Sequence, residues 1–134
     1  VNGNTARDYI AAWRHLVTVF AEEGASNVRW VWSPNVNPDG YLPFERLYPG
    51  DRWVDWLALD GFNFAGGLGW RSFTDIFGSS YEAITRLSSK PLMIAETGSD
   101  EEANRSKAEW ITSMFEREPP PEKLKYLWRE VMAS

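Results

Sequence analysis

Three short segments rich in apolar residues constrain the fold of this chain more than any other feature. They cover residues 27–33, 56–59 and 91–96. Their β-branched and aromatic side chains are typical of strands, and strands that are apolar at nearly every position are typically buried on both faces. Longer stretches with helical spacing of apolar residues lie between and around them. This alternation predicts an α/β fold in which helices cover a parallel sheet.

The helical stretches have recognisable starting signals. Thr5 and Asp8 resemble a capping box, and the apolar face that follows them predicts a helix over residues 6–23. Further helices are expected around residues 81–87, from residues 99–102 onward, and at residues 124–132. The acidic residues at 100–102 would favour the start of a helix because of its dipole. A length of 134 residues allows one domain with one core.

Composition excludes several classes of function. The formal net charge of −5 gives no basic footprint, so nucleic acid is not expected as a partner. The absence of cysteine rules out disulfides and zinc–thiolate sites, and the single histidine, His15, cannot form a metal site alone. No apolar run is long enough to cross a bilayer, so no membrane association is expected. The glycine-rich residues 66–69 lack the lysine of a phosphate-binding loop, and no cofactor is predicted.

Aromatic residues are unusually frequent, at 15% of the chain with eight tryptophans. Most of them are expected in the core, because aromatic side chains bury large areas. Aromatic faces also stack on the apolar C–H faces of sugar rings. The excess is therefore a mild indication of a carbohydrate ligand.

Polar residues follow each predicted strand, and parallel α/β folds place their ligand sites at this carboxyl edge of the sheet. Glu96 ends the third apolar segment, where it would either act in catalysis or cap the following turn. Asn35 and Asn63 would either bind sugar hydroxyls or cap turns. Trp70 would be either a sugar-stacking residue or a buried loop anchor, whereas core packing is the default expectation for Trp32.

Five segments follow one another in the chain: they read YIAAWRH at residues 9–15, NVRWVWSPN at 27–35, YPGD at 48–51, DWLALDGFN at 55–63 and KPLMIAETG at 90–98. Together they resemble glycoside hydrolase family 26, a family of β-mannanases and relatives that act on β-glucans and β-xylans. The resemblance runs in order over roughly residues 5 to 115. Each segment alone is a weak signal, but their order makes the set fairly specific.

The resemblance implies a partial (β/α)8 barrel, in which residues 1–134 are a fragment from the C-terminal half of one glycoside hydrolase catalytic domain. Residues 28–33, 56–59 and the segment ending at Glu96 would be strands five to seven, with residues 6–23 as the helix before strand five. The family's enzymes are retaining glycosidases, and their nucleophile corresponds to Glu96. Their acid/base glutamate ends the fourth strand, which would lie outside this sequence. A whole barrel needs about 250 residues.

Further implications concern the substrate and the partners. The expected substrate is a plant or microbial β-glycan, most simply β-1,4-mannan, with substrate-binding positions at Trp32, Asn35, Phe62, Asn63 and Trp70. Phe62 stands where the family leads us to expect a tyrosine that donates a hydrogen bond to the nucleophile. Such an enzyme would be secreted, although no signal segment is visible in this sequence.

A second interpretation is a half-barrel that binds carbohydrate, or only self-associates, without catalysis. Retaining chemistry needs two carboxyl groups, so the isolated chain is expected to be inactive if the acid/base glutamate lies elsewhere. Asp60 is instead expected to be structural, bonded to backbone amides at the corner between strand and loop. Open sheet edges and apolar strand faces favour pairing, either as a homodimer or with the complementary half of a barrel.

Overall fold

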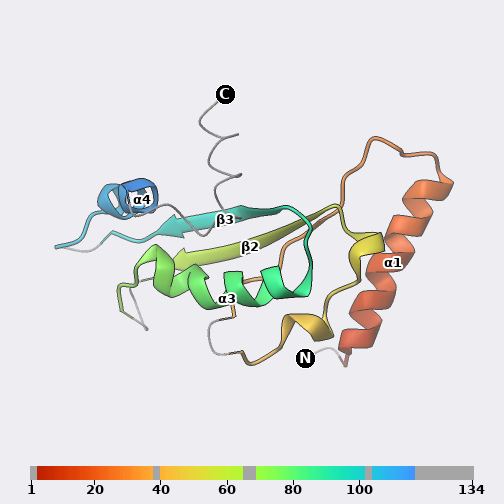
Figure 1. The fold of residues 1–134 in the computed structure, drawn as a ribbon, viewed down its shortest axis with the longest axis horizontal. Coiled ribbons are helices and arrows are strands. Elements are labelled where there is room, and N and C mark those ends of the chain that lie inside the picture. The colour runs from red at the N-terminus through yellow and green to blue at the C-terminus, as the bar shows by residue number, and fades with distance from the viewer. Residues whose placement is uncertain (1–2, 38–39, 65–68, 102–103, 117–134) are drawn as a thin grey trace.

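The computed structural model describes residues 3–37, 40–64, 69–101 and 104–116. Within these ranges the strands form one parallel sheet in the order β1-β2-β3 (Figure 1). The elements in chain order are α1 (Ala6–Glu22), β1 (Val31–Trp32), the 3-10 turns η1 (Phe44–Arg46) and η2 (Asp51–Trp53), β2 (Trp56–Asn63), α3 (Phe73–Leu87), β3 (Leu92–Ser99) and α4 (Lys107–Glu116). The predicted parallel α/β arrangement is thus confirmed for these three strands.

The central strand β2 is buried because it has neighbours on both sides and α3 against one face. Leu57, Ala58 and Leu59 are fully buried, as the continuous apolar run predicts. Gly61 marks the closest approach of α3, since a Cβ atom there would lie 2.7 Å from Cζ of Phe77. The face of β2 that carries Gly61 and, by strand alternation, Leu57 and Leu59 is therefore the face that α3 covers.

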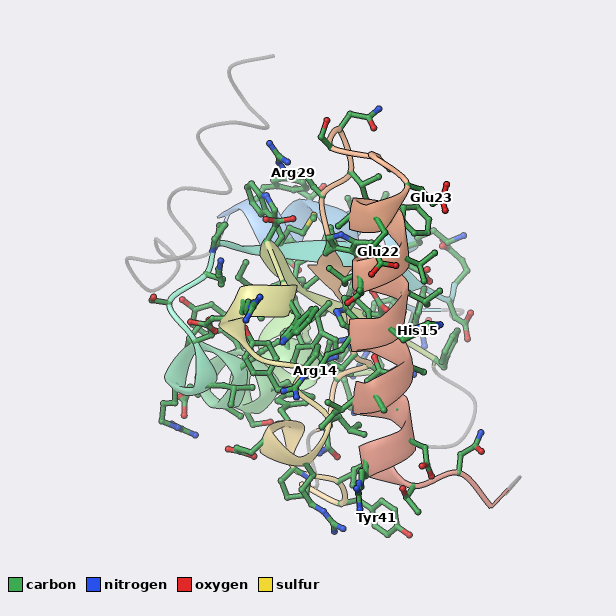
Figure 2. All side chains as sticks on the ribbon, turned by 90° about the vertical axis from the view of Figure 1, so that its right-hand side faces the viewer. Arg14, His15, Glu22, Glu23, Arg29 and Tyr41 are labelled. Atoms are coloured by element: carbon green, nitrogen blue, oxygen red, sulfur yellow. The ribbon has the colours of Figure 1, made fainter. Side chains whose placement is uncertain are left out.

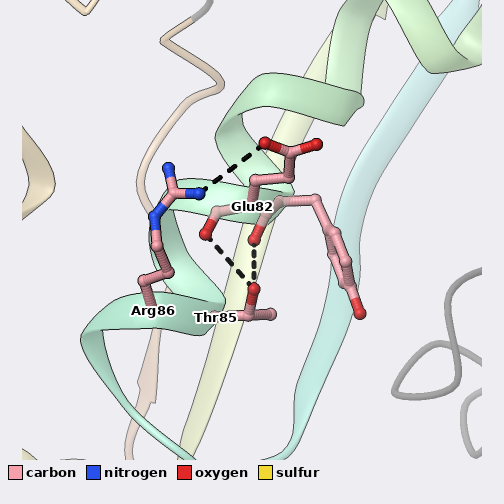
Figure 3. A network of polar contacts seen from close by, with 4 residues as sticks. Glu82, Thr85 and Arg86 are labelled. Carbon is pink, nitrogen blue, oxygen red and sulfur yellow. Dashed lines mark hydrogen bonds and ion pairs between the residues drawn. The ribbon is translucent and has the colours of Figure 1, made fainter.

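Helix α3 is longer than the sequence pattern predicted, because its start signal lies further upstream. Ser72 and Asp75 form a capping box that begins the helix at Phe73 rather than near Tyr81. The inner side of α3 packs into the core through Ile76, Phe77 and Ile84. On the outer side Glu82 and Arg86 form an exposed ion pair at 3.7 Å, and the hydroxyl of Thr85 donates to the Tyr81 carbonyl (Figure 3). An exposed pair of this kind contributes little to stability.

Helix α1 lies at the end of the sheet where the strands begin (Figure 1). The predicted capping box of Thr5 and Asp8 is confirmed, and the helix ends at Glu22. Two side chains hold it in place. The indole of Trp13 donates to the carbonyl of Trp53. Arg14, labelled in Figure 2, donates two hydrogen bonds to the carbonyl of Pro49. No residue of α1 is fully buried. Within the described ranges, no helix has the length and apolar content that a membrane span requires.

The first strand is much shorter than predicted. The pattern predicted a strand over residues 27–33, but only Val31–Trp32 form one. Before it, the amide of Trp30 donates to the side chain of Asp55, so this amide is not available for a strand ladder. The carbonyl of Trp30 accepts from the amides of both Asp55 and Trp56. At Trp30 a side chain therefore replaces the backbone acceptor of the amide, while the carbonyl keeps its backbone hydrogen bonds.

The third strand is longer than predicted, and the helix after it starts later. β3 continues to Ser99, and the amide of Asp100 still pairs with the carbonyl of Asn63. The helix predicted to begin at residues 99–102 starts at Lys107, where Ser106 and Glu109 bond each other's backbone amides. The predicted helix at residues 124–132 lies outside the described residues, as does most of the glycine-rich loop.

Tyr48 fastens the loop before η2. Its hydroxyl donates to Asp51 at 2.6 Å, and its ring packs edge-on against Trp32. Burial, followed by the hydrogen bond to Asp51, raises the pKa of Tyr48 from 10.0 to about 12. The same hydrogen bond lowers the pKa of Asp51.

The raised pKa of Tyr48 predicts how the free energy of unfolding changes at alkaline pH. A raised folded-state pKa gives stability that is fully present below pH 10.0, the unfolded value, and is lost as pH rises toward about 12. We therefore expect the free energy of unfolding to fall less steeply between these pH values in Tyr48→Phe than in the unsubstituted protein. Urea unfolding at a series of pH values measures this difference. If the free energy of unfolding depended on pH in the same way in the two proteins, the prediction would be wrong.

Candidate active site

The carboxyl ends of three parallel segments meet at one edge of the sheet, and each contributes a polar residue there. Asn35 forms an isolated bridge with Asp60, and Asp60 is paired in register with Glu96. Neighbouring strands lie about 4.8 Å apart, so these three residues form a short row across the sheet. The sequence predicted that polar strand ends would gather at this edge, and the register brings these three together.

A β-bulge decides which way Glu96 points. Leu59 pairs with Ile94, but the next residue of β2, Asp60, pairs with Glu96, so Ala95 is the extra residue of the bulge. Without the bulge, Glu96 would lie opposite Gly61, on the face that α3 covers. With it, Glu96 shares the opposite face with Asp60, because paired residues of neighbouring strands project to the same side. Bulges are frequent beside active sites for this reason.

Glu96 is exposed and has no hydrogen bond or ion pair with another residue that the structure describes. The strand continues three residues beyond it to Ser99, so Glu96 does not stand at a turn. The alternative in which its carboxylate caps the following turn therefore finds no support in the described residues. An exposed carboxylate on the face that α3 leaves uncovered is available for chemistry.

Asp60, the register partner of Glu96, is held by a side chain from the neighbouring segment. Its Oδ1 accepts a hydrogen bond of 2.7 Å from the hydroxyl of Ser33, and Asp60 is half-buried. The sequence predicted a structural Asp60 bonded to backbone amides, but the donor is Ser33. Backbone bonds from Val36 to Asp60 and from Asp60 to Pro34 keep the two segments in register.

Two phenylalanines continue the same face beyond Asp60. Phe62 is paired with Gly98, two residues past Glu96, and its half-buried ring stacks on Phe64 with centroids 5.2 Å apart. The Phe64 side chain is 61% exposed. Sequence reasoning missed Phe64, although the period-two spacing of Asp60, Phe62 and Phe64 was a signal for it.

The other predicted substrate-binding residues lie in different surroundings. Trp32 is 1% exposed and packs against Phe44 and Tyr48. Asn63 is fully buried; its amide nitrogen donates to Ser99 and its oxygen accepts from the amide of Arg71. Asn63 thereby ties the loop after β2 to β3.

Trp70 and Asn35 remain closer to solvent. Trp70 is half-buried against the core, and the guanidinium of Arg105 lies 5.9 Å from its ring centroid. Asn35 is exposed beside Asp60. Contact with substrate stays a prediction for Trp32, Asn35, Phe62, Asn63 and Trp70 alike.

The described residues also form a groove away from the edge that carries Glu96. A shallow groove of about 430 Å³ lies between α1 and η2, near the amino ends of the strands. It is lined by Val17, Thr18, Ala21, Glu22, Arg52 and Trp53. It contains none of the candidate residues, and the chemistry at the carboxyl ends is the stronger indication of a site. Among the described residues, no group of three or more histidine or acidic side chains is arranged to hold a metal.

Comparison with known proteins identifies relatives of this chain. The sequence profile of glycosyl hydrolase family 26 matches residues 2–120. Endoglucanase H from Acetivibrio thermocellus is 40% identical over 117 residues, which are 84% of this chain and 13% of that protein. A mannan endo-1,4-beta-mannosidase from Bacillus subtilis is 37% identical over 76 residues, which are 56% of this chain and 17% of that protein.

A solved structure shares the fold. The catalytic domain of a family 26 endo-β-1,4-mannanase from Bacillus sp. JAMB-750 superposes with a TM-score of 0.68 at 27% sequence identity. The match covers 87% of this chain and 32% of that one. The chain thus spans less than a fifth of the two curated relatives and about a third of the matched catalytic domain.

Proposed function

Because this chain belongs to glycosyl hydrolase family 26, we propose that it carries the nucleophile of a retaining β-glycoside hydrolase, and that the nucleophile is Glu96. The observation that carries the proposal is the position of Glu96. Its exposed carboxylate lies at the carboxyl end of a parallel sheet, on the face that α3 leaves uncovered, and a bulge at Ala95 accounts for that orientation. In this proposal β1, β2 and β3 are strands five to seven of a (β/α)8 barrel, and α1 is the helix before strand five.

The mechanism proceeds by two displacements. A carboxylate oxygen of Glu96 attacks the anomeric carbon, the bond to the leaving oxygen breaks, and a second carboxylic acid gives that oxygen its proton. The same acid, now ionised, then takes a proton from water, whose oxygen attacks the anomeric carbon and releases Glu96. Two inversions leave the configuration of the sugar unchanged.

The second carboxyl group has to lie about 5–5.5 Å from Glu96. Asp60 is adjacent, but its Oδ1 already accepts from Ser33 and the side chain is half-buried. We therefore assign the acid/base role to a glutamate outside residues 1–134. If that glutamate ends the fourth strand of the barrel, it would face Glu96 across the barrel interior, on the side of the sheet that α3 leaves uncovered.

The substrate we propose is a β-1,4-linked mannan or a related β-glucan. The support is chemical and comparative: one relative is named an endoglucanase and another a mannan endo-1,4-beta-mannosidase. Polysaccharide substrates of this kind are found outside the cell, so we also propose that the protein is secreted. The test compares turnover of mannan and β-glucan by two proteins. One is the longer protein that would contain the complete barrel, called the whole protein below, and the other is residues 1–134 alone. We expect turnover only by the former, and turnover by residues 1–134 alone would contradict the assignment of the acid/base residue.

An alternative without catalysis is also testable. On the described residues the outer edge of β3 has no strand beside it, and α1 exposes Tyr9, Leu16 and Phe20 by 41–51%. Such surfaces favour a partner, either a second copy or the complementary part of a barrel.

We expect residues 1–134, prepared alone, to associate. Light scattering coupled to size-exclusion chromatography measures the mass directly, and a mass of at least two chains is the expected result. Adding the complementary part of the barrel should replace self-association with a one-to-one complex. A stable monomer over a wide concentration range would contradict this prediction.

A further inference from the structure

The exposed aromatic ring of Phe64 lies beside the candidate active site and takes no part in the mechanism proposed above. Phe64 directly follows β2, and its side chain is 61% exposed. It is not a loose side chain, because its ring stacks on Phe62 with an interplanar angle of 14° and a centroid distance of 5.2 Å. One face of the Phe64 ring is thus supported by another ring, and the exposed fraction shows that much of the rest meets solvent.

The support beneath Phe64 is itself fixed. Phe62 lies within β2, is half-buried, and is the register partner of Gly98. A Cβ atom at Gly98 would lie 3.5 Å from the Phe62 ring, so the backbone of β3 runs close to that ring. A rigid ring loses little conformational entropy when a ligand packs on it, which favours binding.

Phe64 lies on the same side of the sheet as Glu96. Asp60 is the register partner of Glu96, and Phe62 projects to the same face two residues later. Because the Phe64 ring stacks on the Phe62 ring, Phe64 lies on this face as well. Four residues of strand separate Asp60 from Phe64, which is about 13 Å. That distance is longer than one sugar ring, so Phe64 stands beyond the sugar that Glu96 would attack.

Trp70, which the sequence suggested as a sugar-stacking residue, is less available. It is half-buried against the core, and Arg105 lies over its ring. Phe64 therefore offers the more open aromatic face of the two.

We propose that Phe64, supported by Phe62, is a stacking platform for a sugar ring of the β-glycan, outside the subsite where the bond is cleaved. The apolar C–H face of a pyranose would pack on the open face of the ring. This inference rests on the proposed function, because it takes the position of Glu96 as the position of cleavage. It predicts that long oligosaccharides use Phe64 and short ones do not.

The experiment compares Phe64→Ala and Phe64→Trp in the whole protein, with linear β-1,4-manno-oligosaccharides of increasing length. We expect Phe64→Ala to raise KM roughly 3- to 10-fold for long oligosaccharides with kcat unchanged. The shortest cleaved substrate should show no change, and Phe64→Trp should restore the lower KM. Tyr41→Ala is the matched control, because Tyr41 is 93% exposed and lies in the loop before η1.

Two results would overturn the inference. They are an unchanged KM for long oligosaccharides and an equal rise in KM for short and long ones. An unchanged KM together with a lower melting temperature of Phe64→Ala would mean that Phe64 packs against another part of the protein. Calorimetric binding of the longest oligosaccharide to the Glu96→Gln protein, with and without Phe64→Ala, keeps the two proposals separate. If Glu96→Gln retained turnover, the proposed nucleophile would be wrong, while the binding loss would still report on Phe64.

Discussion

Replacing Glu96 with glutamine in the whole protein should lower kcat on a β-1,4-glycan by at least about a thousandfold. Glutamine has nearly the same shape, but its neutral amide is a poor nucleophile for the anomeric carbon. Stability should hardly change, because Glu96 is exposed and makes no hydrogen bond with another described residue. Initial rates of reducing-sugar release measure the effect. The control is Glu82→Gln, on the outer side of α3, which should leave kcat unchanged (Figure 3).

Azide distinguishes a nucleophile from an acid/base residue at this position. In Glu96→Ala, azide can enter the vacated space and attack the anomeric carbon once, so the glycosyl azide should have the configuration opposite to that of the substrate. If Glu96 were instead the acid/base group, azide would react with a glycosyl-enzyme intermediate and the product would keep the original configuration. Nuclear magnetic resonance of the product reads the anomer. A retained configuration, or a kcat of Glu96→Gln close to that of the unsubstituted protein, would contradict the assignment.

The same substitution, glycine to alanine, should have opposite effects on stability at two positions, one in β2 and one in α3. In Gly61→Ala the new methyl group would lie 2.7 Å from Cζ of Phe77 and 3.0 Å from Cγ2 of Ile76, too close without a shift of α3. Overpacking of this kind costs about 1–3 kcal/mol of unfolding free energy. This cost exceeds the gain of about 0.4–1 kcal/mol from a less flexible unfolded chain.

Gly78→Ala is the matched control, within α3. There the new methyl group would meet its nearest neighbour, Cγ2 of Thr74, at an ordinary 3.7 Å. Alanine is favoured over glycine inside a helix by about 1 kcal/mol, so this variant should be more stable than the unsubstituted protein. Chemical unfolding of the whole protein measures the unfolding free energy of both variants. Equal stability of the two variants would contradict the close contact between α3 and Gly61.

The sequence was sufficient to predict the parallel α/β arrangement because its apolar runs have the lengths and continuity of buried strands. It also located the start of α1, since the side-chain partners Thr5 and Asp8 lie close together in the chain. Its predictions failed where a distant residue determines a local structure. The amide of Trp30 donates to Asp55, 25 residues away, and this shortens the first strand.

The candidate site was predicted in outline and not in geometry. Polar residues after apolar runs placed Glu96 and Asn35 at one edge, because parallel strands end on the same side. The bulge at Ala95 depends on pairing between β2 and β3, and no local pattern at residues 91–96 reveals it. The bond from Ser33 to Asp60 likewise joins residues 27 positions apart. Phe64 was within reach of the sequence, through its alternation with Asp60 and Phe62.

The most direct test of the account is to trap the covalent intermediate on the whole protein. A 2-deoxy-2-fluoro mannoside or glucoside with a good leaving group forms the glycosyl-enzyme readily and releases it slowly, because the fluorine disfavours the positively charged transition state. Mass spectrometry of the digested protein then locates the label. The account predicts one sugar per chain, attached to Glu96. A label on Asp60 or any other residue, or turnover of the reagent without a label, would contradict it.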